Sequence, residues 1–118
     1  EMVVCHAGMP KSMVGRDDKA VQSHCLYGEV EGKRLDGLPI RGERYMETWP
    51  AGDGNSILVH GHVPAHSYRK SENLNVFRID QGCAFGGSLT AFSYPELQFT
   101  SVRAKQVYVE MSDANWAA

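Results

Sequence analysis

Two histidine-bearing stretches contain the residues whose types suggest chemistry. Residues 57–64 read Ile-Leu-Val-His-Gly-His-Val-Pro, and residues 2–10 read Met-Val-Val-Cys-His-Ala-Gly-Met-Pro. In each stretch a short aliphatic run is followed by histidine, glycine and proline. Imidazole binds borderline metals and transfers protons near neutral pH. The sequence therefore predicts a histidine site at the ends of two strands.

The spacing of the histidines leaves more than one interpretation open. His60 and His62 lie two positions apart, so on a continuous strand they would share a face and could bind one metal with His6. If the strand ends at His60, the following turn redirects His62 and this parity no longer holds. No C-x-x-C or H-x-x-E-H pattern is present, and a hydrogen-bonded histidine at a strand end also explains His6. Spacing alone therefore fixes no ligand set.

Several elements must position these histidines. The aliphatic runs at 2–5 and 57–60 predict buried strands of an open α/β sheet, whose carboxyl ends are where ligands bind. Residues 20–27 have the apolar spacing of a short helix, and 45–49 of one helical turn. Residues 28–44 are rich in glycine and charge, which predicts a long surface loop with a functional role.

The second half of the chain alternates between apolar and polar residues, which predicts a β-meander. In its second strand, Leu89 and Ala91 point to one face while Phe92 and Tyr94 point to the other, so both faces are expected to be covered. A polar tail is expected over 111–118. The meander strands are expected at residues 75–80, 88–94, 97–102 and 105–110, with a glycine-rich turn at 82–87.

Composition limits the class of protein. The chain has 118 residues, the size of one domain, and a net charge of −2, which indicates neither a nucleic-acid footprint nor a polybasic membrane patch. No apolar run reaches the roughly 20 residues of a membrane helix. Cys5, Cys25 and Cys83 form no C-x-x-C pair, which favours reduced thiols in the cytoplasm. The first strand starts almost at Glu1, so we expect the segment to belong to a longer domain.

Four segments, taken in order, resemble one protein family: VVCHAGMP, YGEVEGKRLDGLPIRGERYMETW, LVHGHVP and FRIDQGCAFGGSLTAFSYPELQFTSVRA. The ordered set resembles the second half of the calcineurin-like metallophosphoesterases. The nearest branch contains bacterial polynucleotide kinase-phosphatase phosphatase domains, PrpE-like bis(5′-nucleosyl)-tetraphosphatases and related Ser/Thr protein phosphatases. The resemblance runs from Val3 to Tyr108. It implies that residues 1–110 are the strand-rich C-terminal half of a four-layer α-β-β-α sandwich.

The resemblance also implies a metal site. His6 and His62 stand where the family has ligands of one metal in a site for two divalent ions, Mn, Fe or Zn. His60 has no metal role by this match. Ala7 and Val63 depart from the family pattern, but neither departure removes a ligand atom.

Further residues are assigned less specifically. Asp80 follows a predicted strand and could orient a histidine or cap the turn at Gly82. By the resemblance, Cys83 and Phe85 belong to the segment that overhangs the substrate, and either Arg41 or Arg44 contacts phosphate.

Three hypotheses follow. The family's earlier motifs, which supply the remaining metal ligands and a histidine, do not occur in this chain. The first hypothesis is a metal-dependent phosphoesterase that needs an N-terminal half and acts on a dinucleoside polyphosphate of the diadenosine tetraphosphate type, a phosphoprotein or a nucleic-acid end. The second is a non-catalytic binding fragment with exposed apolar patches. The third is a mononuclear site of His6, His60 and His62.

Overall fold

The computed structural model describes residues 1–112 and 115–118. In chain order its elements are β1 (Met2–Cys5), η1 (Lys11–Met13), α1 (Lys19–Tyr27), β2 (Val30–Lys33), β3 (Pro39–Arg41), η2 (Arg44–Thr48), β4 (Ile57–His60), β5 (Val76–Arg78), β6 (Asp80–Gln81), η3 (Cys83–Phe85), β7 (Ser88–Ser93) and β8 (Gln98–Arg103). The predicted helix and helical turn are present, each within one residue of the predicted bounds. The predicted loop at 28–44 contains the antiparallel β2–β3 hairpin.

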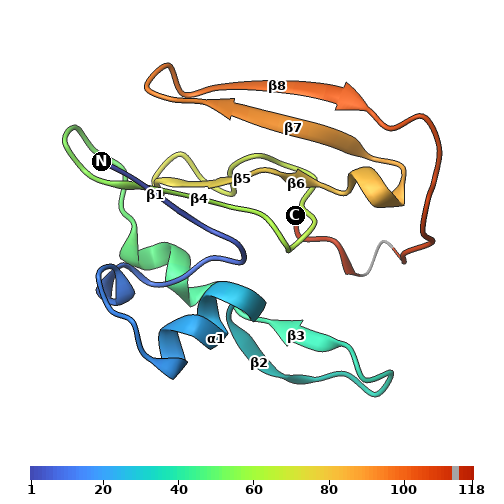
Figure 1. Ribbon diagram of the computed structural model, residues 1–118, viewed down its shortest axis with the longest axis horizontal. Coiled ribbons are helices and arrows are strands. Elements are labelled where there is room, and N and C mark those ends of the chain that lie inside the picture. Colours follow the sequence, from blue (N-terminus) through green and yellow to red (C-terminus); the bar gives the residue numbers. More distant parts are fainter. Residues whose placement is uncertain (113–114) are drawn as a thin grey trace.

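The elements form three layers (Figure 1). A parallel sheet of order β1-β4-β5 lies in the middle, and an antiparallel sheet of order β6-β7-β8 covers one of its faces. The helix α1, the turn η2 and the β2–β3 hairpin lie on the other side. This confirms the predicted strand-rich α/β fold.

Strand β4 is buried along its whole length, as its aliphatic run predicts. Its side chains alternate between two apolar clusters. Leu58 packs with Val76 against Trp49 and the η2 residues Tyr45 and Met46. Val59 packs with Phe77 toward the second sheet. Because both faces of the sheet are covered at β4, the start of this strand carries apolar residues on both sides. The buried strand predicted at residues 2–5 is wrong in this respect, since Met2 and Val4 of β1 are 37% and 61% exposed at the edge of the sheet.

The register of the parallel sheet aligns its carboxyl ends. Cys5 pairs with His60, and His60 pairs with Arg78. The residues that follow these strands therefore emerge at one edge, which places His6 and His62 close together. This is the arrangement in which open α/β sheets form ligand sites.

The predicted meander is only partly present. β5 belongs to the parallel sheet, so the antiparallel sheet begins at β6. The strand predicted at 105–110 is wrong, since the structure assigns no strand to those residues. There the amides of Tyr108 and Val109 both donate to the carbonyl of Ala84, which is a loop contact rather than a ladder.

The outer face of the second sheet is open in this chain. Leu89 and Val102 face each other across β7 and β8, and each is 67% exposed. The prediction that both faces of this strand are covered is therefore wrong. Alternation showed that Leu89 and Phe92 point in opposite directions, but only Phe92 has a layer to pack against.

The C-terminal segment returns to the site. Of the predicted polar tail, residues 113–114 lie outside the described residues. The amide of Ala117 donates to the carbonyl of Pro64 at 2.7 Å, and its carbonyl accepts from the amide of His66 at 3.0 Å. Residues 115–118 therefore lie beside the loop that follows β4.

Helix α1 starts at Lys19 because Asp18 caps it. The Asp18 Oδ1 accepts from the amide of Val21 at 3.1 Å, which satisfies one of the free N–H groups at the helix start. Among the described residues, no helix has the length and apolar character needed to cross a membrane.

Candidate metal and phosphate site

Two backbone turns bring His6 and His62 together. His6 directly follows β1, and His62 lies two residues beyond β4. The Nε2 of His6 and the Nδ1 of His62 are 3.0 Å apart and hydrogen-bonded. The amide of Gly61 donates to the carbonyl of His6 at 2.8 Å, so the backbone of one turn is tied to that of the other. The paired histidines implied by the family resemblance are thus neighbours in the structure.

The turn at His62 uses an unusual conformation. His62 has a φ of 66°, in the left-handed region that few non-glycine residues adopt. The amide of Val63 donates to the carbonyl of Gly61 at 2.8 Å, which closes the turn around it. The predicted shared face of His60 and His62 fails for this reason, because the strand ends at His60 and the turn redirects the next side chain. Such strain is concentrated at functional sites.

Arg41 determines which nitrogen of His62 carries a proton. The Nη2 of Arg41 lies 3.4 Å from the Nε2 of His62. Arginine can only donate, so that Nε2 must accept, and the Nδ1–H of neutral His62 then donates to His6. A metal shared by the two rings would replace this proton.

The electrostatics favour the neutral form of His62. Burial lowers the pKa of His62, and the positive charge of Arg41 and the neighbouring His6 lower it further, while Asp80 opposes them. Neutral imidazole is the form that ligates metals. The contacts of His62 therefore favour the protonation state that a metal ligand would need.

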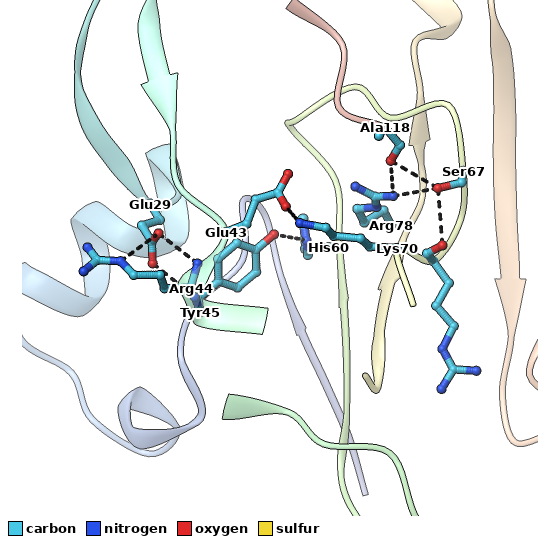
Figure 2. Close-up of polar contacts among 10 residues, drawn as sticks. Glu29, Glu43, Arg44, Tyr45, His60, Ser67, Lys70, Arg78 and Ala118 are labelled. Carbon is cyan, nitrogen blue, oxygen red and sulfur yellow. Dashed lines mark hydrogen bonds and ion pairs between the residues drawn. The ribbon is translucent and has the colours of Figure 1, made fainter. Parts of the chain in front are cut away.

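The two arginines proposed to contact phosphate, Arg41 and Arg44, have different surroundings. Arg41 contacts His62 and also donates to the carbonyl of Tyr27. The Arg44 side chain is 79% exposed and pairs with Glu29 and Glu31. Figure 2 shows the Arg44 and Glu29 side chains beside each other, away from His60. Of the two, only Arg41 is positioned beside the histidine pair.

Two of the three remaining predicted residues line one cavity of about 930 Å³. Asp80 and Phe85 line this cavity together with both histidines, whereas Cys83 is not among its lining residues. The Oδ1 of Asp80 accepts from the amide of Gly82 at 3.0 Å, which is the turn-capping role. Its role as a residue that orients a histidine stays a prediction.

His60 is bound to a different partner from the one the third hypothesis requires. It is 1% exposed, and its Nε2 lies 2.8 Å from the Tyr45 hydroxyl (Figure 2). Its Nδ1 lies 2.9 Å from the carbonyl of Gly61. A carbonyl can only accept, so Nδ1 carries the proton and Tyr45 donates to Nε2. Both nitrogens are occupied, and the structure does not bring His60 to the histidine pair.

Sequence reasoning missed Arg78, a buried cation at the same sheet edge. Arg78 is 1% exposed and donates through Nη2 to the Ser67 hydroxyl and the Ala118 carbonyl (Figure 2). Its Nε and Nη1 have no hydrogen-bond partner in residues 1–112 and 115–118. Burial lowers its pKa. A charged residue inside the apolar run of β5 was the available signal.

The described residues can supply only part of a metal centre. Two imidazole nitrogens 3.0 Å apart suit ligands of one ion, but no group of three or more His, Cys, Asp and Glu side chains gathers in the described part of the chain. Two neutral ligands carry no charge to balance a divalent ion. The two donors would form only part of a metal site, which would need further ligands from outside the described residues.

Comparison with known proteins agrees with this picture. No family model matches the chain. The proteins named asymmetrical bis(5′-nucleosyl)-tetraphosphatase PrpE from Geobacillus sp. (strain WCH70) and Bacillus cereus (strain Q1) are each 38% identical to it, over 112 and 109 residues. The chain is homologous to these proteins. The match covers 92% of this chain but 42% of each PrpE protein, in their C-terminal half. The resemblance to PrpE-like bis(5′-nucleosyl)-tetraphosphatases over their C-terminal half is confirmed.

Proposed function

We propose that this chain is part of a metal-dependent hydrolase that cleaves phosphoanhydride bonds in dinucleoside polyphosphates. The observation that carries the proposal is the pair of His6 and His62, hydrogen-bonded at the carboxyl ends of two parallel strands with Arg41 beside them. The names of the PrpE relatives support the substrate class. They favour a nucleotide over the phosphoprotein that the sequence left as an alternative.

The residues of this chain have defined tasks in such a reaction. His6 and His62 would hold one metal through the nitrogens that now bond each other. Arg41, which keeps spare N–H groups next to His62, would bind a phosphoryl oxygen. When bound, the ions would act as Lewis acids that neutralise the charge on the phosphoryl oxygens. Positioning and electrostatics, rather than a covalent nucleophile, account for catalysis of this kind.

The rest of the site belongs to the part of the PrpE relatives that this chain does not match. Two divalent ions, manganese in our proposal, require ligands beyond two histidines. The calcineurin-like α-β-β-α architecture would supply them from a preceding half, which would also add layers to the three described. Three free cysteines support a cytoplasmic location.

The direct test uses the protein expressed from its complete reading frame. After treatment with EDTA, diadenosine tetraphosphate hydrolysis is followed by chromatography with and without added Mn²⁺, Fe²⁺ or Zn²⁺. We expect activity that depends on added metal, and much weaker activity toward a phosphoserine peptide.

Two results would contradict the proposal. One is hydrolysis at an undiminished rate in excess EDTA. The other is metal-dependent activity on the phosphopeptide with none on the dinucleotide. The same preparation must show a cooperative thermal transition, so that lack of activity is not caused by misfolding.

A further inference from the structure

The cavity beside the histidine pair is much larger than a phosphate group. Its volume of about 930 Å³ lies at the upper end of the range for sites that enclose drug-sized ligands. His6, His62 and Arg41 line one part of its wall, and Phe85 and Trp116 also contribute to the lining. The wall therefore combines a cationic guanidinium and two imidazoles with the aromatic rings of Tyr45, Phe85 and Trp116.

The ring of Trp116 is packed against His66, Phe85 and Gly82. Its ring stacks on His66, with centroids 4.6 Å apart and planes 13° apart, and meets Phe85 edge-on at 6.3 Å. A Cβ on Gly82 would lie 2.0 Å from the indole Cη2, so any residue other than glycine would displace the ring. Together with the backbone bonds of Ala117, these contacts fix the position of the ring.

The indole lines the cavity by a part of the ring that His66 does not cover. His66 stacks on one face of the ring and is not among the cavity-lining residues, whereas Trp116 lines the cavity and is partly exposed. The other tryptophan, Trp49, is 0% exposed and donates its indole N–H to the carbonyl of Met9, so it serves the core. Trp116 has no such core role.

The hairpin β2–β3 contacts the same segment. The Nη1 of Arg34 donates to the Asn115 Oδ1 at 2.6 Å, next to Trp116, and Arg34 itself lines the cavity. Arg34 also pairs with Asp36 at 3.0 Å. The hairpin that carries Arg41 and the segment that carries Trp116 therefore border one space.

We propose that Trp116, with Phe85 at its edge, is a stacking platform for the nucleobase of a nucleoside polyphosphate. The base lies on the side of the indole away from His66, and its phosphates extend toward Arg41 and the histidine pair. This inference rests on the proposed function for the place of the phosphates. Every base has a π-face that can stack on an aromatic ring, so the platform recognises the nucleoside and not the polyphosphate chain.

The test compares ATP with inorganic tripolyphosphate in EDTA, where the metal site is empty and no turnover occurs. The protein expressed from its complete reading frame is titrated by fluorescence and by calorimetry. We expect ATP to quench the emission of Trp116 and tripolyphosphate to leave it unchanged. The variant Trp116→Phe supplies the background emission, and the quenching must disappear in it.

Affinity provides the second readout. Trp116→Leu should weaken ATP binding by roughly tenfold or more and leave tripolyphosphate binding unchanged, while Trp116→Phe should restore most of the affinity. Phe85→Leu should weaken ATP binding less than Trp116→Leu does. It replaces Trp116→Leu as the test variant if that protein does not fold. Tyr94→Leu removes an exposed aromatic ring outside the cavity lining and should bind ATP normally.

Equal binding of ATP by the wild type and Trp116→Leu would overturn the platform, as would quenching that survives in Trp116→Phe. These outcomes are separate from failure of the proposed function. Absence of metal-dependent dinucleotide hydrolysis would refute the enzyme, yet ATP quenching that requires Trp116 would still support the platform.

Discussion

His6 and His62 are 56 positions apart in the sequence, yet a hydrogen bond of 3.0 Å joins their rings. The contact depends on the pairing of Cys5 with His60 and on the left-handed turn at His62. Backbone hydrogen bonds hold both turns, and these bonds position the two ring nitrogens. This preorganisation is what a ligand pair needs to bind an ion with little rearrangement.

His62→Ala should abolish metal-dependent turnover while keeping the fold. The side chain is only partly buried, so thermal stability should change little, but the loss of a ligand should lower kcat/KM by about 100-fold or more. The measurement is dinucleotide hydrolysis with Mn²⁺ in the complete protein, with circular dichroism as the check of folding. Full activity of this variant would refute the ligand assignment.

Arg41 and Arg44 should differ in their effect on catalysis. Arg41→Ala removes a guanidinium 3.4 Å from His62, and the loss of a charge-assisted bond to phosphate should lower kcat/KM by about tenfold or more. Arg44→Ala removes an exposed side chain paired with Glu29 and Glu31 and should change kcat/KM by less than about threefold. The reverse order would place the phosphate on the other side of the hairpin.

Tyr45→Phe should destabilise the fold by about 1–3 kcal/mol. Tyr45 is 6% exposed, and its hydroxyl is the donor to the Nε2 of buried His60. Its removal leaves a buried acceptor without a partner. The matched control is Tyr68→Phe, whose hydroxyl contacts Ser101 in an exposed setting and should cost less than about 0.5 kcal/mol. Urea denaturation measures the free energy of unfolding of both variants. Equal losses of stability would show that the buried hydrogen bond between Tyr45 and His60 contributes no more than the exposed one.

His60 should make stability depend on pH between about 6.5 and 4. Burial lowers its pKa from 6.5 to about 4, and Arg78 and His62 act in the same direction, while the bond to the Gly61 carbonyl and the charge of Asp80 oppose them. The folded state holds His60 neutral. As the pH falls below 6.5 the unfolded state binds a proton first, so stability is full above pH 6.5 and declines toward pH 4.

The loss should reach roughly 3 kcal/mol across this window. It is measured as the free energy of unfolding at several pH values in EDTA. The variant His60→Asn, which cannot titrate there, should show a flatter profile between pH 7 and 5. Identical slopes in the two proteins would exclude His60 as the cause.

The sequence was sufficient for the features set by local pattern. The aliphatic run at 57–60 predicted the buried central strand. The glycine and proline after it allowed a turn that redirects His62, but the spacing alone left open whether the strand ends at His60. Alternation in residues 88–94 predicted a strand there and correctly placed Leu89 and Phe92 on its opposite faces. It could not show whether a second layer covers Leu89, because that depends on chain segments outside the strand.

The features that sequence reasoning missed depend on contacts between distant segments. Nothing near Tyr45 indicates that its hydroxyl binds His60, since the two meet only when η2 packs under the sheet. Trp116 lies in a polar tail whose position is fixed by pairing with residues near Ala65. Choosing between Arg41 and Arg44 also required the hairpin geometry, because both lie in one short charged stretch.

Arg78→Met should leave the fold as stable as the wild type or more stable by about 1–2 kcal/mol. The buried Arg78 guanidinium has two nitrogens without hydrogen-bond partners among the described residues, and its two bonds go to the Ser67 hydroxyl and the Ala118 backbone oxygen rather than to a carboxylate side chain. Burying a cation without a counter-charge costs several kcal/mol, whereas methionine fills similar space at no such cost.

The matched control is Arg69→Met. Arg69 donates to two backbone carbonyls and Asn75 and lies 5.0 Å over the Phe77 ring, so its loss should cost about 2 kcal/mol. Denaturant unfolding compares the two, and an equal loss in Arg78→Met would mean that its hydrogen bonds outweigh the desolvation of its charge.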